Sequence, residues 1–207
     1  MKTNVPKPHT FVFCPYLAQE ARYVLRALRP EFGEQNLAFF PAYCDTCGKP
    51  DWPHYVQHKR LTGQVHIIGG SCLSQSGTLL EDPKVHIYKL EHCFSWLINP
   101  ELIASKLQEG SYIVFPGWTA TWRTHLRVLG FDPPSRAREF FQESMSKILL
   151  LDTGMHKHFR AHTQALASAV GLPWERVPAG VQYLQMQLTQ ILLRSHAYQS
   201  PWTVENE

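Results

Sequence analysis

Three cysteines follow predicted strands in this chain, and thiolates are soft ligands that suit zinc and iron–sulfur clusters. Cys14 ends the apolar segment TFVFC, Cys72 lies in the glycine-rich turn after a strand over 65–69, and Cys93 follows a strand over 85–89. In a parallel α/β sheet, the loops that leave the carboxyl ends of the strands share one edge, where ligands bind. The sequence therefore predicts one shared metal site built from the three thiols.

Small and polar residues at the same strand ends are predicted to line a pocket beside the thiols. Glycine lacks a Cβ, so the backbone before Cys72 can approach a ligand closely. The predicted lining residues are Gly69, Gly70, Ser71, His92, Trp118 and Asp152. The alternative for Cys14 and Cys93 is a purely structural role, because free cysteine is among the most buried residue types.

A second pair of cysteines, Cys44 and Cys47, lies in a long predicted loop over 42–63. His54 and His58 follow the pair at H-x₃-H spacing, which permits a small local zinc site. Two other arrangements remain open at this point. Cys44 joins the shared site, since it too lies just after a strand, or the pair is an exposed dithiol.

A histidine-rich segment, MHKHFRAH, follows the strand predicted over 148–151. His158 and His162 are four residues apart and would share a helical face. No glutamate stands between them as in the zinc motif H-E-x-x-H, so a solvated first turn of a helix, with His156, is predicted. The chain also lacks the phosphate-binding glycine motifs and the G-x-S-x-G nucleophile elbow.

Composition excludes several classes of protein. The 207 residues are 44% hydrophobic and 12% aromatic, which is typical of a globular chain. A net charge of +3 with scattered Lys and Arg argues against nucleic-acid binding. No apolar run approaches the ~20 residues of a membrane span, and no apolar stretch of a secretory signal precedes the first strand. We therefore expect a cytoplasmic protein with reduced cysteines, whose partner is a small molecule or another protein.

Strands alternate with helical runs along the chain, which predicts a doubly wound, mostly parallel α/β sheet with helices on both faces, of Rossmann or flavodoxin type. A single domain over 1–194 and a flexible tail or linker over 195–207 are expected. The predicted strands are 10–14, 36–41, 65–69, 85–89, 111–115, 148–151 and 174–177. The predicted helices are 17–28, 93–98, 100–109 after the N-cap Asn99, 119–129, 136–146 after the N-cap Ser135, 155–170 and 180–194.

The chain resembles the DUF1638 family, which has no settled activity. The resemblance is carried by FVFCPYLAQEARYVL, IIGGSC, LEHCFSWL, GSYIVFPGWTATWRTHL, ILLLDTG and GLPWERVPAGVQYLQMQL. It implies that Cys14, Cys72 and Cys93 occupy recurring cysteine positions of the family, with His92 beside the third. Leu73 stands where the family often has glycine, and the pair Cys44/Cys47 is outside its pattern. The resemblance also implies a link to corrinoid and methyl-transfer systems.

Three functional hypotheses follow from these residues. The first is a metalloprotein whose three thiolates hold an iron–sulfur cluster, favoured slightly over zinc, with an open position that binds a small substrate or accepts electrons. The second is a non-enzymatic redox or metal sensor, with Cys44 as the fourth ligand of a closed centre. The third is zinc-dependent methyl or acyl transfer, in which zinc activates a thiol substrate.

Overall fold

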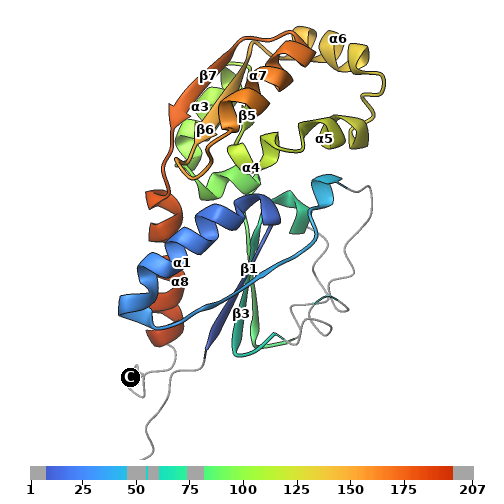
Figure 1. The fold of residues 1–207 in the computed structure, drawn as a ribbon. Helices are drawn as coiled ribbons and strands as arrows, with labels where there is room; N and C mark the ends of the chain where they lie inside the picture. The colour runs from blue at the N-terminus through green and yellow to red at the C-terminus, as the bar shows by residue number, and fades with distance from the viewer. Residues whose placement is uncertain (1–7, 46–54, 56–60, 74–81, 198–207) are drawn as a thin grey trace, which may run out of the picture.

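The first sheet of the protein consists of four parallel strands in the order β2-β1-β3-β4 (Figure 1). The structure is a computed structural model that describes residues 8–45, 55, 61–73 and 82–197. The central strands are buried on both faces, as expected for apolar runs in a parallel sheet. The strands are β1 (His9–Phe13), β2 (Asn36–Phe39), β3 (Gln64–Gly69) and β4 (Val85–Lys89).

The remaining strands form a second parallel sheet in the order β5-β6-β7. They are β5 (Ser111–Val114), β6 (Lys147–Asp152) and β7 (Trp174–Pro178). The predicted α/β class is thus confirmed, but the strands are divided between two sheets, since β4 and β5 share no ladder in the described part of the chain. Only Val85 is fully buried in β4, so this strand has the half-exposed character of a sheet edge. One continuous hydrophobic core nevertheless spans both sheets.

Helices flank both sheets, and the last helix ties them together. Helix α3 packs on β5, while α7 contacts α4, α6 and β7. Helix α8 leaves the second sheet and packs against α1 beside the first sheet (Figure 1). The helices are α1 (Ala18–Phe32), α3 (Pro100–Gln108), α4 (Pro116–Thr119), α5 (Trp122–Val128), α6 (Pro134–Ser144), α7 (Phe159–Val170) and α8 (Gln182–Ala197). None of the described helices has both the length and the apolar character that crossing a membrane requires.

Several helix boundaries differ from those predicted. The single helix predicted over 119–129 is instead the shorter α5, and a separate short helix, α4, precedes it because Pro116 starts a helical turn. Pro133, rather than Ser135, is the N-cap of α6. Helix α7 begins only at Phe159, so His156 precedes the helix. Helix α8 continues to Ala197, three residues into the predicted tail, and 198–207 lie outside the described residues.

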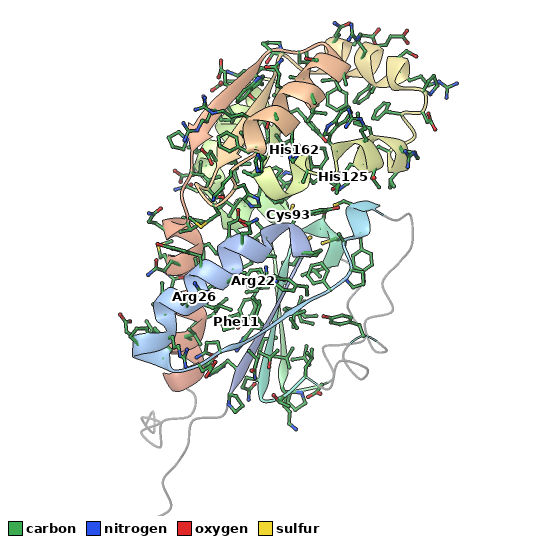
Figure 2. All side chains as sticks on the ribbon, viewed as in Figure 1. Phe11, Arg22, Arg26, Cys93, His125 and His162 are labelled. Atoms are coloured by element: carbon green, nitrogen blue, oxygen red, sulfur yellow. The ribbon has the colours of Figure 1, made fainter. Side chains whose placement is uncertain are left out.

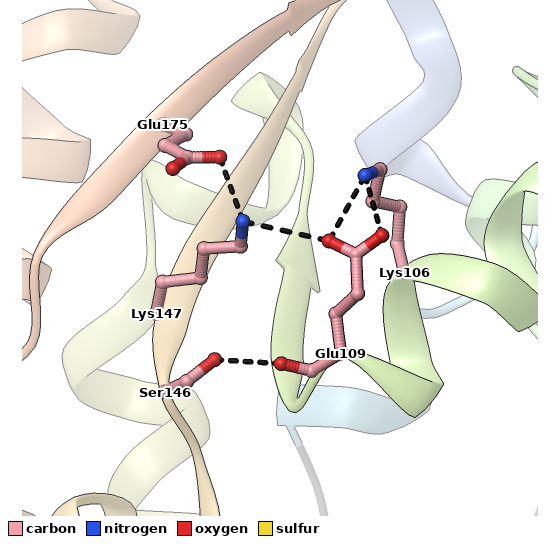
Figure 3. A network of polar contacts seen from close by, with 5 residues as sticks. All are labelled: Lys106, Glu109, Ser146, Lys147 and Glu175. Atoms are coloured by element: carbon pink, nitrogen blue, oxygen red, sulfur yellow. Dashed lines mark hydrogen bonds and ion pairs between the residues drawn. The ribbon is translucent and has the colours of Figure 1, made fainter.

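The amino ends of the second sheet are held by a network of charged groups (Figure 3). Lys147 Nζ donates to Glu175 Oε2 over 2.9 Å and lies 3.6 Å from Glu109 Oε2. Lys106 Nζ donates to Glu109 over 2.7 Å, and Ser146 Oγ donates to the Glu109 carbonyl over 2.8 Å. Ion pairs this close to solvent contribute little to stability, so the network fixes the end of α3 rather than forming a reactive site.

Histidines are stacked across the first sheet. His66 of β3 lies level with Phe11 of β1 and His86 of β4, and the rings of His9 and His86 stack on it at 5.1 and 5.4 Å. His66 shares a hydrogen bond of 2.9 Å with His9, and its other ring nitrogen lies 3.3 Å from the Tyr88 hydroxyl. Burial, with smaller contributions from His9 and His86, lowers the pKa of His66 to about 3.

The buried His66 is expected to make the protein sensitive to acid. The unfolded chain takes up a proton on this ring below its usual pKa of about 6.5, whereas the folded chain does so only near pH 3. The free energy of unfolding should therefore be unaffected above about pH 6.5 and fall by about 2 kcal/mol at pH 5. Urea unfolding at pH 5 and 7 measures this difference. It should shrink in His66→Phe and persist in the control His158→Gln, which changes an exposed histidine; an unchanged difference in His66→Phe would contradict the assignment.

Candidate metal centre

The exits of three neighbouring strands bring three of the predicted metal ligands to one edge of the first sheet. Cys14 follows β1 and is the N-cap of the 3₁₀ turn η1 (Pro15–Leu17). Cys72 lies in the turn η3 (Ser71–Leu73) after β3, and Cys93 begins the turn η5 (Cys93–Trp96) after β4. Because β1, β3 and β4 are adjacent and parallel, all three exits lie at the carboxyl edge of the sheet.

The turns that carry Cys72 and Cys93 are in close backbone contact at Gly70. A Cβ on Gly70 would lie 2.6 Å from the backbone nitrogen of Cys93, so no larger residue fits there without a backbone shift. Ser71 N–H donates to the Glu91 carbonyl over 3.3 Å. Trp96 Nε1 donates to the Gly69 carbonyl over 2.9 Å, which anchors η5 to the end of β3. The glycine pair therefore brings the turns of Cys72 and Cys93 together.

The thiols are close enough to act on one another electrostatically. Burial, with smaller contributions from the charges of Cys44 and Cys72, raises the pKa of Cys93 to about 12. Burial likewise places the pKa of Cys14 far above its ordinary value, with further contributions from Cys93, Cys44 and Cys72. The pKa of Cys72 is also raised, chiefly by burial. Figure 2 shows Cys93 at the junction between the first sheet and the helices of the second.

Each of the three turns also offers backbone hydrogen bonds to its sulfur. The backbone at Tyr16 favours the thiolate of Cys14, and the backbone at Phe94 does the same for Cys93. Backbone hydrogen bonds of its own turn likewise favour the thiolate of Cys72. Its thiol also donates to the Gly70 carbonyl over 3.8 Å. Hydrogen bonds to cysteine sulfurs are one of the means by which proteins tune thiolate-bound metals.

The predicted ligands of the loop over 42–63 are described only in part. Cys44 is exposed and lies in the short turn η2 (Tyr43–Asp45), which contacts α5. Cys47, His54 and His58 fall outside the described residues. Within the described part of the chain, no group of three or more His, Cys, Asp or Glu side chains is arranged to hold a metal ion.

The predicted pocket residues occupy different environments. Ser71 is exposed beside Cys72, and the ring of His92 stacks on Phe94 at 4.7 Å. Trp118 of α4 is only 9% exposed, and its ring lies 4.3 Å from that of His125 of α5.

Asp152 is at the carboxyl edge of the second sheet, and both of its carboxylate oxygens accept hydrogen bonds from other groups of the protein. One carboxylate oxygen accepts from Arg176 Nε over 2.6 Å and the other from Gly154 N–H over 2.9 Å. One oxygen is thus engaged within the exit of β6 and the other by Arg176 of β7.

A buried polar network lies beside Cys14, and no motif or residue spacing in the sequence predicted it. The Tyr16 hydroxyl lies 2.8 Å from His125 Nε2 and accepts from Thr121 Oγ1 over 3.0 Å. Burial raises the pKa of Tyr112 of β5, and the charges of Cys44 and Cys93 raise it further. The second sheet and its helices therefore form one wall of the cysteine site, although no spacing pattern connects them to the cysteines.

Glu20 of α1 makes a second buried connection between the sheets. Its Oε1 accepts from Thr153 Oγ1 over 2.6 Å and lies 3.1 Å from His156 Nε2. Glu20 is 0% exposed, and Thr153 is 2% exposed. The predicted solvated turn is thus partly buried at His156, because α1 lies against the exit of β6.

Comparison with known proteins identifies the family of the chain. A family model described as "Protein of unknown function (DUF1638)" matches residues 56–188, a segment that includes Cys72 and Cys93. No curated protein and no solved structure matches the chain. The matched segment is well over half of the 207 residues. The chain therefore belongs to the DUF1638 family, as its strand and cysteine motifs predicted.

Proposed function

We propose that this chain is a cytoplasmic metalloprotein in which Cys14, Cys72 and Cys93 bind one metal centre at the carboxyl edge of the first sheet. The observation that carries the proposal is the backbone contact at Gly70 between the turns of Cys72 and Cys93, at the sheet edge where Cys14 also lies. Sulfur donors select zinc or iron–sulfur clusters over the hard cations that prefer oxygen. The donor set therefore fits a thiolate-bound centre.

We favour a cluster slightly over a single zinc ion. With zinc–sulfur bonds of ~2.3 Å, tetrahedral zinc holds its sulfurs ~3.8 Å apart, whereas a cluster spreads its ligands over several irons. Bound with three protein thiolates, a cluster leaves one iron available as a Lewis acid or electron acceptor for a small substrate.

Proton release should accompany binding of the centre. Burial raises the pKa of all three thiols, to about 12 for Cys93, so the metal-free thiols are protonated at neutral pH. Metal ligation requires thiolates, so each ligand loses its proton on binding and the affinity increases with pH. The backbone hydrogen bonds at each sulfur supply part of the stabilisation that the thiolates need.

The first test is elemental analysis of protein purified without oxygen. Iron and sulfide in near-equal amounts, with a broad visible absorption band, are the expected result. Zinc at about one ion per chain without colour would favour the thiol-activating alternative for methyl or acyl transfer, in keeping with zinc's lack of redox chemistry. A colourless protein with neither metal, in which the three cysteines are freely alkylated, would refute a thiolate centre.

A closed, four-thiolate sensor is the second candidate, because the charge of Cys44 acts on Cys14 and Cys93. The variant Cys44→Ser separates the two candidates, with Cys72→Ser as its matched partner. We expect Cys44→Ser to retain the metal and Cys72→Ser to lose it, which is the pattern of an open site. Equal loss in both variants would favour the sensor.

A further inference from the structure

Three arginines form a basic strip on α1, away from the cysteine turns. Arg22, Arg26 and Arg29 are spaced i, i+4 and i+7, which places them on one face of the helix. All three are exposed, and Figure 2 shows Arg22 and Arg26 along α1. They line a surface groove with Leu25 and with Leu37 of β2. We call this surface the arginine groove.

The arginines differ in how far they are already engaged. The Arg22 guanidinium lies over the Phe39 ring, 5.0 Å from its centroid, which holds its plane in place. Arg29 lies 3.3 Å from Glu34, but their side chains are 62% and 74% exposed, so this pair contributes little. Arg26 makes no ion pair with any residue that the structure describes. At least two guanidinium groups are therefore available to an outside anion.

We propose that the arginine groove binds an acidic segment of a partner protein. Guanidinium groups bind carboxylates through paired, parallel hydrogen bonds. From Arg22 to Arg29 the strip extends ~10 Å along the helix, at ~1.5 Å per residue. This length suits an extended peptide, whereas small-molecule sites enclose most of their ligand.

A neighbouring aromatic residue supports a protein as the partner. Tyr23, next to Arg22 on α1, is 51% exposed. Tyrosine and arginine are enriched among the residues that dominate binding energy in protein interfaces. Leu37, which is partly exposed in the groove, offers a contact to an apolar side chain of the same segment. The partner is thus an acidic peptide stretch that also carries apolar residues.

The test measures binding of a fluorescein-labelled peptide of alternating Glu and Leu by fluorescence anisotropy. The full chain should bind it and release it as salt screens the charges. Arg22→Glu/Arg26→Glu should weaken binding about tenfold or more, and Arg26→Glu alone should weaken it less. The matched control is Arg123→Glu/Arg127→Glu on α5, which makes the same charge change at the same spacing. Arg123 is also stacked on an aromatic ring, 4.4 Å from Trp122.

The outcomes distinguish this groove from general attraction to a basic protein. Unchanged binding in the control, with unchanged thermal melting of Arg26→Glu, supports the proposal. Equal loss in both double variants, or no binding by the unmodified chain, overturns it. Displacement of the peptide by low concentrations of inorganic tripolyphosphate would also overturn it, in favour of a site for small polyanions.

Discussion

Replacing Gly70 by alanine is expected to abolish metal binding by the cysteine turns while the sheets still form. The new Cβ would lie 2.6 Å from the Cys93 backbone nitrogen and 3.0 Å from the His92 carbonyl carbon. Neither atom belongs to a side chain that can rotate away, so the turns of Cys72 and Cys93 must separate. Forced backbone shifts of this kind cost about 1–3 kcal/mol. Metal content after anaerobic purification should fall about 10- to 100-fold, as when supporting residues of metal sites are changed.

The adjacent Gly69 provides the matched control for this variant. Its Cβ would meet the Leu73 side chain at 2.9 Å, and a leucine side chain can change rotamer where a backbone cannot move. Gly69→Ala should therefore keep most of its metal. Full metal content in Gly70→Ala would show that the contact between the two turns does not position the ligands. Equal loss in both variants would point to general damage to the end of β3.

Removal of the Glu20 carboxylate is expected to produce the largest loss of stability. Glu20→Ala leaves the Thr153 hydroxyl and the His156 ring without their buried acceptor and opens a cavity between α1 and the exit of β6. Leaving a buried donor unpaired costs about 1–3 kcal/mol and the cavity adds to this, so a total loss of about 3–5 kcal/mol is expected. Urea unfolding at pH 7, followed by circular dichroism, should show a loss of this size in the free energy of unfolding.

Two variants show whether this loss arises from the buried contacts. Glu31→Ala removes an exposed carboxylate from the same helix and should change the free energy of unfolding by less than about 0.5 kcal/mol. Glu20→Gln keeps an oxygen acceptor of the same size and should lose about 1–2 kcal/mol. A loss in Glu20→Ala no larger than in Glu31→Ala would mean that Glu20 does not hold the two sheets together.

The pattern of apolar and polar residues along the chain was sufficient to locate most strands and the strand ends that carry the thiols. The apolar runs of β1, β3 and β6 lack polar alternation, which is the pattern of strands buried in a parallel sheet. Asn99 was correctly identified as a helix cap, since its side chain accepts from Glu101 N–H over 2.7 Å. Helix starts governed by proline were less predictable, because Pro116 and Pro133 displaced the boundaries of α4 and α6.

The sequence by itself determined the α/β class, the family and the common edge of Cys14, Cys72 and Cys93, because parallel strands all end at the same edge of their sheet. Only the tertiary structure decided that the strands form two sheets. It also decided that Tyr112 and His125 lie near the thiols, and that Glu20 reaches the exit of β6. These contacts join residues roughly a hundred positions apart through packing of non-periodic surfaces. Hydrophobic and turn patterns specify local elements, whereas the pairing of such surfaces depends on the whole core.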